Sequence, residues 1–138
     1  MKKLVQTSNP IQAPASEVWE HLRTGEGVNR WLPMITACRV EGDRRYCEAG
    51  DQPLTETILS SDDGDMTFRY SIEEQSLLPI EDIIGTMRVE SVTPETSILH
   101  WDLSFEVADE ATYAQVKAGL EQIYAQGAEG LERLAVAA

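Results

Sequence analysis

The sequence has 138 residues, with 11 Lys and Arg against 24 Asp and Glu, which gives a formal net charge of −13 at neutral pH. This length suits one domain spanning residues 1–138 and excludes a separate cofactor-binding domain. A hydrophobic content of 42% is typical of a folded protein rather than a disordered one. Because the basic residues do not cluster beyond Arg44 and Arg45, we expect no nucleic-acid partner and no attraction to anionic membranes.

The sequence also bears on membrane spans and targeting signals. No apolar run approaches the ~18 residues of a membrane span, and no apolar segment of a signal peptide follows Lys2 and Lys3. We therefore expect a cytoplasmic protein without membrane insertion. In that compartment Cys38 and Cys47 are expected to be reduced thiols, and two cysteines are too few for a cysteine-based structural zinc site.

The beginning of the chain predicts a strand followed by short helices. Residues 3–12 form the strand, and Pro10 implies an edge position or a bulge because proline cannot donate to a β-ladder. Pro14 suits the first turn of a helix whose apolar residues recur at helical spacing. Gly27 lies beyond the end of that helix, and a short turn or second helix precedes Pro33.

From about residue 35 to residue 107 the apolar residues recur with a period near two, which is typical of half-buried strands. The clearest alternation lies in residues 66–73, 83–90 and 99–107, and turn residues separate these runs. The spacing favours antiparallel connections over parallel crossovers.

After Asp109 the apolar residues form one stripe at helical spacing, which predicts a long C-terminal helix. Gly119, Gly127 and Gly130 lie within it, and each costs about 0.8–1 kcal/mol relative to Ala in a helix interior. Glycines on or beside the stripe indicate close approach to another segment or empty space.

Several short motifs occur in this order along nearly the whole chain: residues 11–19 (IQAPASEVW), 31–33 (WLP), 42–45 (GDRR), 78–80 (LPI), 85–89 (GTMRV), and 99–101 (LHW) followed by Phe105. Together with the order of elements, they resemble the START-like helix-grip (SRPBCC) superfamily, specifically the polyketide cyclase/dehydrase and lipid-transport family. The resemblance implies an α+β helix-grip fold, in which a curved antiparallel sheet wraps around a long C-terminal helix and two short helices follow the first strand.

Within that family the sequence resembles bacterial relatives of the plant abscisic-acid receptors. Residues 60–63 resemble the acidic hairpin of those receptors, and residues 50–54 occupy the place of their gate loop. Residues 77–80 replace the latch motif, and the lysine that grips the hormone's carboxylate falls at Leu32. The resemblance therefore implies a ligand other than abscisic acid.

The resemblance implies an apolar cavity between sheet and helix, whereas periodicity alone favours a solid core. The residues expected to contact a ligand are those that the alternation and the motifs turn inward: Trp31, Leu32, Ile58, Phe68, Ile83, Met87, Trp101, Leu103, Phe105, Ile123, Tyr124 and Gly127. We expect binding or carriage of a small hydrophobic molecule that is aromatic, lipid-like or polyketide-like, by a monomer or homodimer without a cofactor or metal.

Catalysis is the alternative function, as a cyclase, dehydratase or isomerase acting on a polyketide-like carbonyl compound. Glu56 shares a strand face with Leu54 and Ile58, and a carboxylate in such apolar surroundings can serve as a general acid or base. Tyr70 is the second candidate proton carrier. The competing interpretation is that Glu56 is solvated at the cavity mouth or paired with an arginine.

Two further patterns have structural interpretations. His100 and Asp102 share a strand face, but the alternation places that face opposite the cavity. The acidic residues 62–65 lack the glycine position of a calcium-binding loop and predict an exposed hairpin turn.

Overall fold

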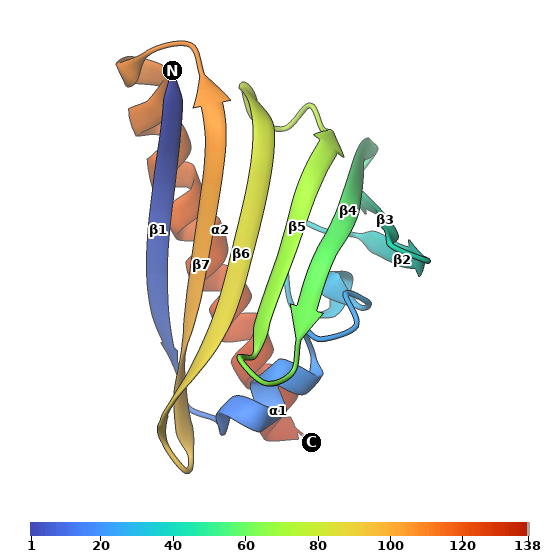
Figure 1. Ribbon diagram of the computed structural model, residues 1–138, viewed down its shortest axis with the longest axis vertical. Coiled ribbons are helices and arrows are strands. Elements are labelled where there is room, and N and C mark those ends of the chain that lie inside the picture. Colours follow the sequence, from blue (N-terminus) through green and yellow to red (C-terminus); the bar gives the residue numbers. More distant parts are fainter. Residues whose placement is uncertain (138) are drawn as a thin grey trace.

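A computed structural model describes residues 1–137 of the protein. Seven antiparallel strands form one curved sheet in the order β1-β7-β6-β5-β4-β3-β2, and a long C-terminal helix lies across one face of it (Figure 1). The elements in chain order are β1 (Lys2–Ile11), α1 (Ala15–Glu20), the 3-10 helix η1 (Val28–Arg30), β2 (Ala37–Glu41), β3 (Arg44–Ala49), β4 (Gln52–Asp62), β5 (Thr67–Glu74), β6 (Ile80–Thr93), β7 (Thr96–Val107) and α2 (Glu110–Ala137). The predicted helix-grip fold is confirmed.

The alternation of apolar residues sets which face of the sheet is covered. In β7 the residues from Ser97 to Val107 are buried at every second position, and this buried face lies toward α2. Strand β1 pairs with β7 at the end of the sheet, so Pro10 sits on an edge strand, where it removes no ladder bond that the sheet needs. Register shifts in β4, one of them beside Glu56, bend the sheet around the helix.

Helix α2 packs against β1, β7 and α1 through one buried stripe. Its start is capped by Asp109, whose Oδ1 accepts a hydrogen bond from the Thr112 amide at 2.8 Å. Gly130 permits a close approach, because a Cβ atom there would lie only 1.9 Å from the Trp31 carbonyl oxygen. Gly119 has open space instead.

Helix α1 is tied to the hairpin between β4 and β5. The indole Nε1 of Trp19 donates to Asp63 Oδ1 at 2.8 Å, and Arg23 pairs with the same carboxylate. Asp62 accepts from the Gly64 amide within the turn. The acidic residues here therefore form an exposed hairpin turn, as the sequence predicts.

The expectation of reduced thiols is wrong for this structure, because Cys38 and Cys47 form a disulfide. A two-residue turn begins at Gly42, whose φ of +63° suits glycine, and fixes the register of the β2–β3 hairpin. In that register the two cysteines stand directly opposite each other, with Cα atoms 4.0 Å apart. The sequence did not reveal this pairing because it depends on the exact register.

Candidate functional site

A cavity of about 260 Å³ lies between the curved sheet and α2. Its walls come from strands β3 to β7, from the segment that includes η1, from the connection between β5 and β6, and from α2. The residues that line it are Val28, Trp31, Leu32, Met34, Ile35, Arg45, Cys47, Leu54, Glu56, Tyr70, Ile72, Gln75, Leu77, Leu78, Ile80, Ile83, Met87, Trp101, Leu103, Leu120, Ile123 and Tyr124.

Most of the residues that the sequence singled out lie at this cavity: Trp31, Leu32, Glu56, Tyr70, Ile83, Met87, Trp101, Leu103, Ile123 and Tyr124. Four do not line it, namely Ile58, Phe68, Phe105 and Gly127. The alternation therefore placed side chains on the correct face of the sheet but did not separate the cavity wall from the filled part of the core.

The four residues that do not line the cavity lie in the part of the core that side chains fill. Ile58 and Phe68 pack against the backbone at Gly25, which leaves no space beside them. Phe105 is fully buried, with its ring centroid 6.3 Å from that of Tyr113. Gly127 lies beneath the rings of the two cavity tryptophans and has no side chain of its own to present.

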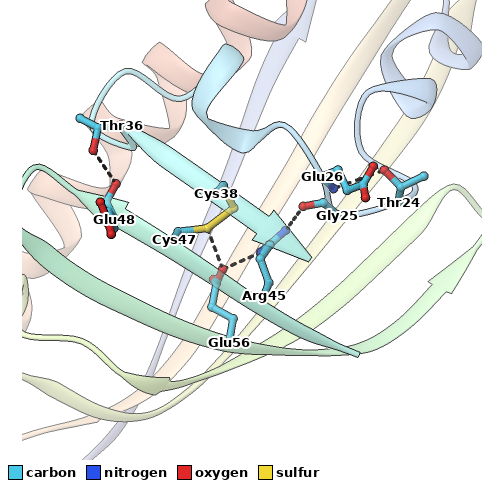
Figure 2. Close-up of a disulfide and its surroundings, with 9 residues drawn as sticks. All are labelled: Thr24, Gly25, Glu26, Thr36, Cys38, Arg45, Cys47, Glu48 and Glu56. Atoms are coloured by element: carbon cyan, nitrogen blue, oxygen red, sulfur yellow. Dashed lines mark hydrogen bonds and ion pairs between the residues drawn. A yellow bond between two sulfur atoms is a disulfide. The ribbon is translucent and has the colours of Figure 1, made fainter. Parts of the chain in front are cut away.

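The charged part of the wall is a buried ion pair between Arg45 and Glu56 (Figure 2). These residues are register partners on β3 and β4, and Arg45 Nε donates to Glu56 Oε1 at 2.6 Å. Arg45 Nη1 also donates to the Gly25 carbonyl at 3.2 Å, and the guanidinium stacks 5.3 Å from the ring centroids of Phe68 and Tyr70. The sequence-based alternative in which an arginine pairs with Glu56 is the arrangement found.

The disulfide adjoins this ion pair. Cys47 Sγ lies 3.8 Å from Glu56 Oε1, and Figure 2 shows the sulfur bridge beside the carboxylate. A disulfide sulfur has no proton and cannot donate, so this is a packing contact, and Arg45 is the donor to that oxygen. The bridge thus covers one side of the Glu56 carboxylate and joins edge strand β2 to the cavity wall.

A second polar group in the wall consists of aromatic side chains. Trp101 Nε1 donates to the Tyr70 hydroxyl at 2.9 Å, and the Trp101 ring stacks on Tyr124 with centroids 3.8 Å apart. Burial raises the pKa of the Tyr70 hydroxyl well above its usual value, and the negative charge of Glu56 raises it further. Burial also raises the pKa of Tyr124, so both hydroxyls stay protonated at neutral pH.

Tyr70 reaches this position because residue 85 is a glycine. The two residues are register partners on β5 and β6, and a Cβ atom at Gly85 would lie 2.2 Å from the Tyr70 ring. A side chain at position 85 would therefore push the Tyr70 ring away from Trp101.

The third polar feature of the wall is Trp31, which follows η1. Its ring meets that of Trp101 edge-on, with centroids 5.8 Å apart, and the residue is 3% exposed. Among the residues that the structure describes, its Nε1 is the buried side-chain nitrogen or oxygen that has no hydrogen-bond partner.

Sequence reasoning missed several wall residues. Arg45 and Cys47 lie on β3, whose short polar sequence shows no apolar alternation. Gln75, Leu77 and Leu78 lie in the connection between β5 and β6, where periodicity gives no signal. An acidic residue at an inward strand position was a usable signal for Arg45, because a buried carboxylate requires a partner.

His100 lies on the other face of the sheet, as predicted. Its Nδ1 is 2.8 Å from Ser8 Oγ and its Nε2 is 2.7 Å from Glu90 Oε1, so its partners are these residues and not Asp102. The hydrogen bond from His100 holds the pKa of Glu90 below its usual range. The cluster is separate from the cavity.

A larger hollow of about 1290 Å³ runs along the ends of β5 and β6. It is an open groove whose lining includes Glu73, Glu74, Glu81, Asp82 and Glu106. This groove carries five acidic side chains, whereas the wall of the cavity between the sheet and α2 is mostly apolar and aromatic, so that cavity is the better candidate site for an apolar molecule.

No group of three or more His, Cys, Asp or Glu side chains is arranged to hold a metal ion within residues 1–137. No helix in the same range is both long and apolar enough to cross a membrane.

Residues 2–136 match the family described as polyketide cyclase / dehydrase and lipid transport. Among solved structures, an uncharacterised protein from Bacillus thuringiensis superposes with a TM-score of 0.85 at 22% identity, covering 97% of this chain and 99% of its own. The protein XoxI from Bacillus cereus gives 0.84 at 21% identity, with coverage of 96% and 95%. A START superfamily protein from Mycobacterium smegmatis gives 0.81 at 14% identity, with coverage of 98% and 99%.

The three structures share the fold of this protein, and their identities are too low for more than that conclusion. No curated protein matches the sequence. The match over nearly the whole length shows that the chain belongs to the polyketide cyclase/dehydrase and lipid-transport family.

Proposed function

We propose that this protein binds or carries a small hydrophobic molecule in the cavity between its sheet and α2. The observation that supports the proposal most is a cavity of about 260 Å³ whose wall is mostly apolar and aromatic. The family as a whole suggests hydrophobic ligand binding in general.

The size of the cavity limits the ligand. An apolar cavity of about 150 Å³ is large enough to bind benzene. A space of about 260 Å³ therefore suits a compact molecule, such as one substituted ring or two fused rings, better than a long acyl chain. Burial would supply most of the affinity, at about 25 cal/mol per Å² of apolar surface removed from water.

Two segments are proposed as lids. Residues 50–54 and 77–82 border the cavity through Leu54, Leu77 and Leu78, all of which are partly exposed. A ligand that enters between these segments would bury their leucine side chains on closure.

Native purification followed by organic extraction and mass spectrometry tests the proposal. We expect a stoichiometric small molecule in the extract and a matching mass increment on the intact protein under native conditions. Protein that is empty and also fails to bind neutral hydrophobic dyes would contradict the proposal and favour a solid core.

Catalysis by Glu56 and Tyr70 is a weaker proposal. Both side chains lie at the cavity, which supports it. However, Glu56 is held by Arg45, and the raised pKa of Tyr70 makes its hydroxyl a poor acid at neutral pH. The arrangement suits binding better than proton transfer.

Four further predictions from the sequence remain predictions. These are a cytoplasmic location, a monomer or homodimer, the lack of a nucleic-acid partner and the relation to abscisic-acid receptors. The disulfide bears on the first, because disulfides are rare in reducing compartments. Trapping thiols by alkylation in intact cells would show whether the bridge is present where the protein resides.

A further inference from the structure

Glu56 has one carboxylate oxygen that the protein leaves unpaired. Its Oε1 accepts from Arg45 Nε at 2.6 Å and lies against Cys47 Sγ, whereas Oε2 accepts no hydrogen bond from any residue that the structure describes. Among the side-chain nitrogens and oxygens of the described residues, Trp31 Nε1 alone is both unpaired and fully enclosed. Oε2 is unpaired but not enclosed, so it keeps accessible surface although the Glu56 side chain is only 5% exposed.

The accessible surface of Glu56 belongs to the cavity. Glu56 lies on the inner face of the sheet, where its register partner Arg45 and the neighbouring Tyr70 also line the cavity. Burial raises the pKa values of the Tyr70 and Tyr124 hydroxyls, and the negative charge of Glu56 raises both further. The carboxylate therefore acts on polar groups of two walls, one on β5 and one on α2.

The chemistry of Oε2 restricts what can lie beside it. An ionised carboxylate oxygen only accepts hydrogen bonds, and a buried acceptor without a donor costs free energy. A donor on a bound molecule would remove this cost, and its hydrogen bond to a charged oxygen would be roughly twice as strong as one between neutral groups. Arg45 already neutralises the charge of Glu56 at 2.6 Å, so a cationic donor would itself be left without a counter-charge.

We propose that the ligand is a neutral, compact ring compound with a hydroxyl group, and that this hydroxyl donates a hydrogen bond to Glu56 Oε2. The inference rests on the proposed function, because it assumes that the cavity binds a small molecule. It assigns to Glu56 the recognition of the polar end of the ligand, while the apolar wall binds the ring.

Three naphthalenes with the same ring system test the inference. The hydroxyl of 2-naphthol donates and keeps its proton at neutral pH, as phenols do. The ketone of 2-acetylnaphthalene only accepts, and 2-methylnaphthalene does neither. Dissociation constants are measured by equilibrium dialysis, and the naphthol preference is the dissociation constant of 2-methylnaphthalene divided by that of 2-naphthol. Such a ratio cancels general changes in the affinity of the cavity.

The double variant Arg45→Met/Glu56→Leu removes the carboxylate without leaving a buried charge unpaired. Its matched control is Lys3→Met/Glu110→Leu, which removes an ion pair of the same 2.6 Å length outside the cavity. We expect the naphthol preference to fall roughly tenfold in the first variant, because a hydrogen bond to a charged group is lost. It should stay unchanged in the control.

The ketone tests a competing contact at the same ion pair. Arg45 Nη2 also makes no hydrogen bond to the described residues, and it would donate to a ligand oxygen. If Arg45 rather than Glu56 recognised the ligand, the preference for 2-acetylnaphthalene over 2-methylnaphthalene would fall in Arg45→Met/Glu56→Leu. We expect no such fall.

Wild-type protein with ¹³C-labelled glutamate gives a readout that does not depend on a variant. The Glu56 Cδ resonance is assigned through its bonds to the backbone and followed during titration. Because 2-naphthol and 2-methylnaphthalene exert nearly the same ring current, a difference between them reports the hydroxyl. We expect 2-naphthol to shift this resonance further than 2-methylnaphthalene does.

A naphthol preference that survives in Arg45→Met/Glu56→Leu, or a Glu56 Cδ resonance that moves equally with both probes, would overturn the inference and leave hydrophobic binding intact. Loss of a ketone preference in that variant would overturn it as well, in favour of Arg45. Failure of all three probes to bind wild-type protein would instead contradict the proposed function itself.

Discussion

Arg45 and Glu56 face each other across β3 and β4, with Nε and Oε1 2.6 Å apart and residue exposures of 6% and 4%. Removing one partner from such a pair leaves an uncompensated buried charge, which costs far more than removing both. The pair therefore makes Glu56 a structural residue as well as a candidate functional one.

The first prediction concerns this pair. Glu56→Gln should lower the free energy of unfolding by about 3–5 kcal/mol, because Arg45 keeps its charge without a carboxylate. The double variant Arg45→Met/Glu56→Leu should recover most of that loss. Urea denaturation of both variants beside the wild type is the measurement, and a double variant that is less stable than Glu56→Gln would contradict the account.

This prediction also affects how catalysis is tested. A loss of turnover in Glu56→Gln alone would not distinguish a missing proton carrier from a destabilised cavity. The double variant, if folded, separates the two explanations, since it lacks the carboxylate without leaving a buried charge.

The second prediction concerns two glycines of α2 in different surroundings. Gly130→Ala would place a methyl group 1.9 Å from the Trp31 carbonyl oxygen, so α2 or η1 must move. We expect a net loss of about 1–3 kcal/mol despite the better helix propensity of Ala. Gly119→Ala has open space and should gain up to about 1 kcal/mol.

Thermal and urea unfolding of the two glycine variants measure these changes in the free energy of unfolding. Equal effects at both positions would mean that the close approach of α2 to Trp31 does not exist in solution.

The third prediction concerns the disulfide. Treatment with dithiothreitol should lower the free energy of unfolding of the wild type by about 2–3 kcal/mol, because the Cys38–Cys47 bridge closes a loop in the unfolded chain. The variant Cys38→Ser/Cys47→Ser should not respond to the reductant. Thiol titration in denaturant should find no free thiol in untreated wild-type protein, and two free thiols there would contradict the bridge.

The fourth prediction concerns pH. The hydrogen bond from Arg23 and that from Trp19 hold the pKa of Asp63 below its usual range in the folded protein. A depressed folded-state pKa adds stability above the unfolded pKa of about 3.9, and this stability is lost as the pH falls through the folded-state pKa. Asp63→Asn should therefore be less stable than wild type at pH 7 and converge with it at strongly acidic pH.

Unfolding by urea at several pH values between 7 and 2 measures the difference between wild type and Asp63→Asn. A difference that stays constant over this range would show that the charge of Asp63 contributes nothing to stability.

The sheet and the long helix could be predicted because their signals are local. The alternation of apolar residues along 99–107 predicts a strand with one buried face. The apolar stripe after Asp109 predicts a helix that covers such a face. The same alternation placed Glu56 inward, where the structure has it. These features depend on the period of the sequence and not on register.

The contents of the core could not be predicted in the same way. The side chains of Phe68 and Phe105 point inward and fill the core. Those of Tyr70 and Trp101 also point inward, but they border the cavity. The bridge between Cys38 and Cys47 depends on the register of β2 and β3, which the turn at Gly42 sets. The partner of Glu56 depends on the register of β3 and β4, which the turn at Gly50 sets. The unpaired N–H of Trp31 depends on packing around η1, for which no local pattern exists.

Methyl NMR with 2-acetylnaphthalene tests the central claim, that the space between sheet and helix is a binding site, most directly. Ile83, Leu103 and Ile123 line the cavity, whereas Leu4, Val92 and Val136 are exposed on the outside of the molecule. The account predicts saturable shifts and intermolecular nuclear Overhauser effects at the first three methyl-bearing residues and none at the last three. Shifts confined to the exposed residues, or none at saturating probe, would contradict it.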